Sequence, residues 1–352
     1  MKESRIRDSL LRTGLTATAV LCIVVLVILA AGADPLDAIK HLFLGSLGSW
    51  NKFSHVLTAW IPLVLCACGL LFTFRIDLWN IGIEGQVVAG AICATAMLRL
   101  GAGNLPPALL VTLAFAAGAA GGACWASLAG MLKIRGGVNE IFAGLGLNFV
   151  AQAITLWLIF GPWKRPGIAS MSGTQPFEPE LWLPAVTRIR ISPVGLIIAV
   201  AALAFTAFIL RRTRLGLALD AIGRNRSAAF LHGLKPERFT LAAMGLAGGM
   251  AGLAGTFQVT GVYHRLIPAI SSNYGYLALL VVMLAGYRAG PTPAIAFFFA
   301  CLNVGSIQLP MMLRIDSSLS GVIQGAFVLA FLLIHSLTAH RKRPPEGGTG
   351  WS

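Results

Sequence analysis

A small set of polar side chains lies within or beside long apolar stretches of this 352-residue sequence. An ionised or amide side chain in hydrocarbon costs a few kcal/mol, so such residues face a partner, a cavity or water. We therefore expect them to line or gate a route through a membrane. The residues in question are Asn80, Glu84, Gln86, Asn139, Glu140, Asn148, Gln152, Asn303 and Gln324.

The two carboxylates in this set have two interpretations. Glu84 and Glu140 each lie near the start of an apolar stretch, where a carboxylate is favoured by the helix dipole. Each can cap a helix start or pair with a nearby cation, namely Arg75, Lys133 or Arg135. The alternative is a role at a gate or along the pathway.

Two amides lie deeper in an apolar stretch. Asn148 and Gln152 are four residues apart and therefore share one face of a helix. Lining of a pathway and hydrogen bonding between helices explain them equally well. Gly82 and Gly85 flank Glu84, and we expect them to loosen the helix there, which makes residues 80–86 a candidate for a discontinuous helix.

Enzyme chemistry lacks a recognisable motif. The sequence has no G-x-x-x-x-G-K-[ST] phosphate loop, no H-E-x-x-H and no G-x-S-x-G. Its six histidines are scattered, and its six cysteines lie within apolar stretches without the spacing of a zinc site or a disulfide framework. We therefore predict no catalytic residue, no bound metal and no cofactor.

The elements that position the polar residues follow from composition. Apolar residues make up 57% of the chain and charged residues 11%, with a mean hydropathy of +0.79, which excludes a soluble globule. A membrane-spanning helix needs about 20 mostly apolar residues. The sequence predicts an all-α polytopic membrane protein with ten spans: 14–32, 53–74, 79–98, 105–132, 138–161, 193–210, 239–262, 274–287, 291–309 and 319–337.

Charge supports this count. With the N-terminus inside, 18 of the 27 Lys and Arg residues fall in inner segments, as positive-inside topology requires. Both termini are then cytoplasmic, and the net charge of +14 is a topology signal rather than a nucleic-acid-binding face. The first stretch also imitates a secretory signal, with a cleavage site at Ala31-Gly32-Ala33, but it is long for a signal.

Small residues recur every four positions in two spans, which lets helix backbones approach closely. Tight packing and a moving interface are both compatible with this pattern. The positions are Gly118, Gly122, Ala126 and Gly130 in the fourth span, and the pairs Gly245/Gly249 and Gly248/Gly252 in the seventh.

The segment 211–238, between the sixth and seventh spans, is strongly basic. Asn225 can cap a short helix within it, and Gly233 can end that helix in a left-handed turn. The helix carries Phe230 and Leu231, which should dock onto something. That surface is either the inner leaflet, as membrane lipid, or a soluble partner.

Several of these segments resemble one family. The run 80–86 (NIGIEGQ) resembles the signature of membrane permeases of ABC importers in the branched-chain amino acid, ribose and nucleoside superfamily, and most of all the nucleoside subgroup. Further matches follow in order at 138–140, 216–225, 245–255 and 323–325. The chain departs from the family at Tyr274 to Val282, where bulkier residues would change the pore lining.

The resemblance implies a single permease domain over 1–352, with a coupling loop at 211–238, an outer loop at 162–192 and a basic cytoplasmic tail at 338–352. It implies a second permease, a paralogue or a second copy, and an ABC ATPase subunit. A periplasmic or lipid-anchored binding protein would deliver a nucleoside-like solute across the bacterial inner membrane. The residues similar to a coupling helix are Arg224, Asn225, Ala228, Ala229, Phe230, Leu231 and Gly233.

The alternative is a secondary transporter driven by an ion gradient. It requires carboxylates near the middle of the membrane and an inverted repeat. Glu84 and Glu140 lie too near the inner ends of their spans, and no clear repeat is visible. The outer loop, with Lys164 and Arg165 facing Glu178 and other charges, is either a landing area for the binding protein or a solvated surface.

Overall fold

The computed structural model describes residues 34–167, 172–186 and 191–313, together with isolated helical positions in the flanking segments. The chain divides into two compact units, Met1–Phe53 with Cys301–Ser352, and Ser54–Ala300. The predicted spans 14–32 and 319–337, Gln324, the 323–325 match and the tail 338–352 lie outside the residues described in full. The isolated positions are Thr18, Cys22, Val25, Leu26, Leu29, Val322, Gly325 and Leu329.

The described part of the chain contains helices, turns and loops but no strand. Six helices in it are long and apolar enough to cross a membrane, and two shorter apolar helices follow. These eight correspond to the second to ninth predicted spans. The long helices are α3 (Trp50–Arg75), α4 (Ile83–Gly101), α5 (Pro107–Gly136), α6 (Glu140–Phe160), α7 (Pro193–Arg212) and α10 (Pro236–Phe257), which continues as a π-helical turn, η2 (Gln258–Val262); the shorter ones are α11 (Tyr274–Leu284) and α12 (Thr292–Leu313).

Four shorter elements were not among the predicted spans. In the first unit, α2 (Pro35–Leu47) begins at an Asp34 cap whose side chain accepts from the Leu36 N–H at 2.8 Å. A Cβ on Gly305 of α12 would clash with the backbone of Leu42, so α2 and α12 are in close contact there. The others are η1 (Pro179–Leu181), α8 (Arg214–Arg224) and α9 (Arg226–Leu231), the last of which was expected as the short helix of the basic segment.

The second unit is built on three helices, α4, α5 and α10, which pack through small residues. A Cβ on Gly122 would clash with the backbone of Gly248, and one on Gly252 with the backbone of Gly118. The expectation of tight packing is confirmed for these positions. Gly249 differs, because the nearest atom to a Cβ there would be 3.8 Å away.

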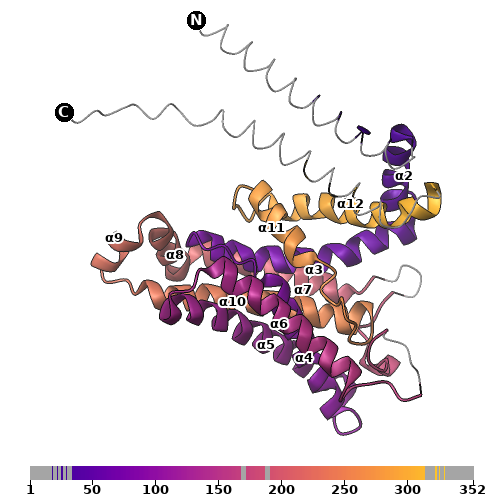
Figure 1. Ribbon diagram of the computed structural model, residues 1–352, viewed down its shortest axis with the longest axis horizontal. Coiled ribbons are helices and arrows are strands. Elements are labelled where there is room, and N and C mark those ends of the chain that lie inside the picture. Colours follow the sequence, from indigo (N-terminus) through magenta and orange to yellow (C-terminus); the bar gives the residue numbers. More distant parts are fainter. Residues whose placement is uncertain are drawn as a thin grey trace, which may run out of the picture. The chain divides into compact units, whose positions relative to one another are not determined.

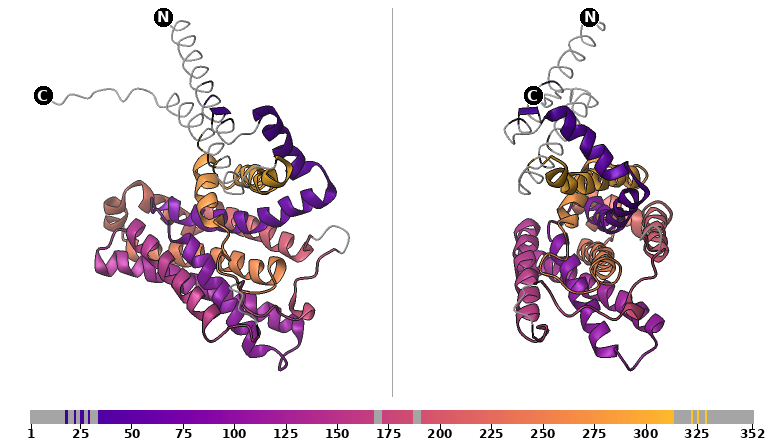
Figure 2. Two further views of the ribbon diagram at one scale, coloured as in Figure 1. Left: turned by 45° about the vertical axis from the view of Figure 1, so that its right-hand side comes forward. Right: turned by 90° about the vertical axis from the view of Figure 1, so that its right-hand side faces the viewer.

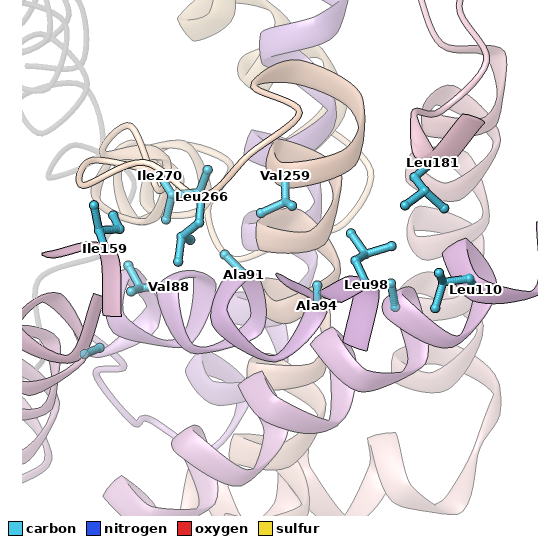
Figure 3. Close-up of a cluster of buried hydrophobic side chains, with 12 residues drawn as sticks. Val88, Ala91, Ala94, Leu98, Leu110, Ile159, Leu181, Val259, Leu266 and Ile270 are labelled. Carbon is cyan, nitrogen blue, oxygen red and sulfur yellow. The ribbon is translucent and has the colours of Figure 1, made fainter. Parts of the chain in front are cut away.

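A cluster of buried apolar side chains lies beside this three-helix core. Figure 3 shows Val88, Ala91, Ala94 and Leu98 along α4, with Val259 of η2 above them. Their burial follows from the four-residue and three-residue spacing that places them on one helix face. The other members come from α5, α6, the outer loop and residues 263–273: Leu110, Ala114, Ala151, Ile159, Leu181, Leu266 and Ile270.

The third predicted span begins later than expected, because residues 76–82 form turns and α4 starts at Ile83. The expectation that Gly82 and Gly85 loosen the helix is wrong for Gly85, which lies in a regular first turn. The two glycines allow α6 to come close. A Cβ on Gly82 would be 2.9 Å from the Cα of Gly144, and one on Gly85 2.7 Å from Oδ1 of Asn148.

The eighth predicted span, 274–287, is short in the structure. The helix α11 has 11 residues, which at 1.5 Å per residue gives about 16 Å, well below the bilayer core of about 30 Å. A non-helical loop, residues 263–273, precedes it. Backbone of this kind at membrane depth is tolerated only where protein or a water-filled cavity covers it.

The two ends of the second unit differ. Figure 1 shows α8 and α9 together at one end of α5, α6 and α10, and the left view of Figure 2 agrees. The turn between α4 and α5 lies at the opposite end, on the side of the outer loop. The predicted inner and outer connections are therefore gathered at opposite ends of this unit.

Candidate functional site

The predicted polar residues of the third span form a closed pair. Asn80 donates to Oε1 of Gln86 at 3.2 Å, and Gln86 donates back to Oδ1 of Asn80 at 2.8 Å. Both side chains are buried. The pair fixes the turn before α4 to the first turn of the helix, which identifies these two amides as structural supports of the site.

Asn148 joins α6 to two other elements. Its Oδ1 accepts from the Gly85 N–H at 2.8 Å, and its Nδ2 donates to the Ile81 carbonyl at 3.0 Å and to the Tyr276 hydroxyl at 3.2 Å. The first N–H groups of a helix have no partner within the helix, so Asn148 supplies one to α4. The predicted hydrogen bond between helices is present, and through Tyr276 it extends to α11.

Glu84 connects the starts of two helices. It lies in the first turn of α4, and its Oε2 accepts from the N–H of Gly275, in the first turn of α11, at 2.8 Å. The side chain is 7% exposed, and no cation pairs with it among the described residues. The predicted pairing with Arg75, Lys133 or Arg135 is therefore wrong for Glu84, because the positive ends of the two helix dipoles take the place of a cation.

Glu140 pairs with a nearby cation, as the first of its two interpretations expected. Its Oε2 lies 2.6 Å from Nζ of Lys133, and both side chains are partly exposed. Asn139 caps α6, because its Oδ1 accepts from the Ile141 N–H at 2.8 Å. Both residues therefore fix the start of α6, and their place on the pathway stays a prediction.

The loop 263–273 brings further polar groups to the site. Gln152 donates to the carbonyl of Pro268, and Gln258 donates to the carbonyl of Ile270 at 3.3 Å. The hydroxyl of Ser272 lies 3.0 Å from that of Tyr263. Tyr263 and Tyr276 are each 37% exposed, so both rings border the surface of the unit.

Sequence analysis missed three of these groups. Gln258 was a detectable signal, since it is an amide within an apolar span, whereas Tyr263 and Ser272 sit beyond the span and carry no distinctive spacing. Tyr276 lies in the segment whose bulkier residues were expected to change the pore lining, but its hydrogen bond was not predicted. Two predicted residues are not part of the cluster. Asn303 lies in α12 in the other unit and is partly buried, and Gln324 lies outside the described residues.

The outer loop is fastened to the segment that follows α10. Leu183 N–H donates to the Thr260 carbonyl at 3.0 Å, and Phe177 N–H to the His264 carbonyl at 2.9 Å. Trp182 stacks on His264 with centroids 3.9 Å apart. Part of the predicted landing area is therefore bound to the segment after α10, and its Arg188 and Arg190 lie outside the described residues.

Near this loop, the Arg99 guanidinium lies 5.5 Å from the centre of the Trp163 ring. Trp163 donates its backbone N–H to the Leu158 carbonyl at 2.8 Å, which fixes it just beyond α6. The two side chains border a hollow that Phe177 and Glu178 also line. This hollow presents cationic, aromatic and acidic groups at the outer end of the unit.

The opposite end carries α9. Asn225 caps this helix, with its Oδ1 accepting from the Ala228 N–H at 2.9 Å, and Gly233 follows it with a left-handed φ of 84°. Both expectations are confirmed. Phe230 is 65% exposed and Leu231 84%, whereas Ala229 is buried. The remaining residue of the predicted set, Arg224, pairs with Asp220 at 3.2 Å and stays largely exposed.

The chemistry of these sites is that of hydrogen bonding and shape. Across the described ranges, no group of three or more His, Cys, Asp or Glu residues could hold a metal ion. In the cluster of Asn148, Gln152, Gln258, Tyr263 and Tyr276, the three amides are hydrogen-bonded within the protein, and the two tyrosines border the surface. The cluster contains no paired acid and base.

Comparison with known proteins agrees with this picture. The family described as "Branched-chain amino acid transport system / permease component" matches residues 53–332. A glucose ABC transporter permease protein of Haloferax volcanii is 30% identical over 329 residues, covering 91% of this chain and 86% of that protein. A nucleoside ABC transporter permease protein of Lactococcus lactis is 26% identical, covering 80% of this chain and 79% of that protein.

A guanosine ABC transporter permease protein of Bacillus subtilis is likewise 26% identical, covering 86% of this chain and 87% of that protein. The matched region contains every long helix of the second unit and the polar cluster. The resemblance inferred from the motifs is confirmed. The chain is a multi-pass membrane protein and belongs to the permease family of ABC transporters described as the branched-chain amino acid transport system permease component.

Proposed function

We propose that this permease forms half of the translocation pathway of an ATP-driven importer for a nucleoside-like small solute. A second permease, a paralogue or a second copy, forms the other half. An ABC ATPase subunit binds on the cytoplasmic side and hydrolyses ATP, and a periplasmic or lipid-anchored binding protein delivers the solute. The protein lies in the bacterial inner membrane with both termini in the cytoplasm.

The observation that carries this proposal is the exposure of α9. A six-residue helix with a capped start and a left-handed end is rigid, yet it presents Phe230 and Leu231 to solvent. Exposed apolar side chains on a basic segment mark an interaction site. A groove beside them is lined by Arg226, Lys235 and Pro236, so a partner would meet both apolar and cationic groups.

The nature of the solute rests on the relatives and on the cluster. Two relatives are named for nucleosides or guanosine, and their overlap with this chain includes the cluster. Amide and phenol groups recognise neutral hydroxyl-bearing molecules, and a partly exposed tyrosine ring can stack on a base. The relative named for glucose makes a simple sugar the second candidate.

Replacing Phe230 and Leu231 by Asp tests the role of α9. We expect the variant to remain folded, because both side chains are exposed, and to lose both the ATPase subunit on purification and solute uptake. Leu217→Asp is a matched control, since Leu217 is 72% exposed on α8. Uptake that persists with the ATPase subunit still bound would contradict the proposal.

The solute is tested separately. Membrane vesicles containing the complete transporter are supplied with ATP and with labelled guanosine, glucose or an amino acid. Guanosine accumulation that glucose does not compete supports a nucleoside importer. Glucose accumulation alone supports the second candidate, and accumulation driven by a proton or sodium gradient without ATP contradicts both.

A further inference from the structure

One charged contact fixes the helix before α9 to the end of α3. Nη1 of Arg75 lies 3.1 Å from Oδ1 of Asp220, on α8. Next to this pair, Gly223 lies so close to the Arg75 backbone that a Cβ would clash with it. The helices therefore meet without an intervening side chain, and movement of α8 must displace the end of α3.

Asp220 also reaches toward α9. Its second oxygen, Oδ2, lies 3.2 Å from Nη2 of Arg224, and Arg224 directly precedes Asn225, the cap of α9. One carboxylate thus contacts both the last turn of α3 and the residue before α9. No other Asp or Glu in the described ranges bridges two cations.

From Arg75 the chain leads into the polar cluster through a tight turn. Leu78 N–H donates to the Thr73 carbonyl at 3.0 Å, and Asp77 takes a left-handed φ of 54°. Ile76 and Leu78 are buried. A compact, hydrogen-bonded turn that is anchored by two buried side chains transmits displacement instead of absorbing it.

The segment that contains this turn, residues 74–84, contacts both ends of α11. Phe74 packs on Tyr287, just beyond the end of α11, with ring centroids 5.1 Å apart, and on Trp79 at 5.5 Å. At the other end, Glu84 accepts the N–H of Gly275. The segment 74–84 therefore holds α11 at its start and at its end.

We propose that Arg75 and Asp220 are positioning residues that convert movement of α9 into movement of α11. This inference rests on the proposed docking of an ATPase at α9. Both side chains are about one-third exposed, at 36% and 35%. An ion pair at that exposure contributes at most about 1 kcal/mol to stability. Its importance lies in the geometry it fixes between α8 and α3.

A double-mutant cycle tests this role. Arg75→Gln, Asp220→Asn and the double variant are measured in vesicles that contain the complete transporter. The readouts are solute moved per ATP hydrolysed, the amount of ATPase subunit retained and the melting temperature. We expect each single variant to lower solute per ATP by about fivefold or more, the lower limit of typical coupling energies. The double variant should be no worse than either single variant.

Two further variants sharpen the result. Arg75→Lys keeps the charge and should recover most of the transport, while Arg214→Gln removes an exposed cation from α8 that forms none of the described ion pairs and should have no effect. Effects that multiply in the double variant would overturn the inference. So would a parallel loss of the ATPase subunit, which would make the pair part of docking.

The two proposals fail on different results. The proposed function fails if the Phe230 and Leu231 variant keeps both its ATPase subunit and its uptake. The present inference fails if the effects of Arg75→Gln and Asp220→Asn multiply in the double variant. This holds when the transporter retains its ATPase subunit and the Phe230 and Leu231 variant loses uptake as expected.

Discussion

The second unit joins two regions that are held together in opposite ways. In the core of α4, α5 and α10, glycine backbones touch, and side chains as small as a methyl group have no room at several positions. Around α11 and the loop 263–273, buried apolar residues such as Leu266 and Ile270 are joined by hydrogen bonds from amides, hydroxyls and one carboxylate. Close-packed interfaces resist displacement, whereas single hydrogen bonds can be exchanged at little net cost.

This difference assigns separate tasks to the two regions. In the proposed transport cycle, the glycine-packed core would be the scaffold, and α11 with its loop would be the element that changes position. The short length of α11 and the non-helical loop before it agree with this division, because both leave backbone groups that other parts of the protein or water must satisfy.

Two adjacent glycines of α10 provide the strongest test of the scaffold. Gly248→Ala places a Cβ against the backbone of Gly122 and the side chain of Ala126, and such overpacking costs about 1–3 kcal/mol or more. Gly249→Ala meets nothing closer than 3.8 Å. It should stabilise the helix by about 0.5–1 kcal/mol. Thermal unfolding in detergent measures both.

Gly248→Ala should destabilise the protein, and Gly249→Ala should stabilise it. Because the two positions are adjacent, a general sensitivity of α10 to substitution would not produce both results. Equal effects of the two substitutions would mean that the core is not close-packed at Gly248. The assignment of α4, α5 and α10 as the scaffold would then lose its basis.

Glu84 tests the other region, where the conservative variant Glu84→Gln should change transport more than stability. Glu84→Ala leaves the Gly275 N–H buried without its acceptor, which costs about 1–3 kcal/mol. Glu84→Gln keeps an acceptor oxygen and should fold, but it replaces the other carboxyl oxygen by an amide nitrogen that faces two helix starts. We expect it to lower transport and the stimulation of the ATPase subunit.

Both Glu84 variants are compared by melting temperature and by uptake in vesicles. If Glu84→Gln transports solute and stimulates the ATPase at the level of the unmodified protein, Glu84 has no part in the gate. If Glu84→Gln, which keeps an acceptor for the Gly275 N–H, lost as much stability as Gly248→Ala, α11 would instead belong to the scaffold.

The sequence was sufficient to predict the helices and to single out individual polar residues, but not to predict which residues those side chains contact. Apolar length predicted eight helices that the structure contains, and Asn225 with Gly233 predicted the bounds of α9 because capping is a local property. The contact of Glu84 with Gly275 joins positions 191 residues apart. Spacing along the chain carries no information on such a pair.

The same reason explains the error at Gly85. A glycine near a helix start signals either flexibility or close approach of another backbone, and only the position of Asn148 on α6 decides between them. Glu140 was predictable as a partner of Lys133 because both residues flank one short connection. Local pairs were accessible from the sequence, whereas contacts between distant helices were not.

The smallest predicted effect concerns His264, in the part of the loop 263–273 that contacts the outer loop. Partial burial of His264, which stacks on Trp182, lowers the pKa of its imidazole below its ordinary value, although its contact with the Thr260 carbonyl opposes the shift. The unfolded chain therefore binds a proton more readily than the folded one. The stability contributed by neutral His264 is complete above the unfolded pKa of about 6.5. It declines as the pH falls through that value.

His264→Asn removes this titration and suits the left-handed φ of 55° at this position. Melting temperatures of the two proteins should run parallel above pH 7, and between pH 7 and 5 that of the unmodified protein should fall more steeply. Because the outer loop is fastened to this segment through the Phe177 contact with His264, loosening should begin there and not in the glycine-packed core. Hydrogen exchange at pH 5 that is faster in α4 or α10 than in residues 260–266 would contradict the division between the two regions.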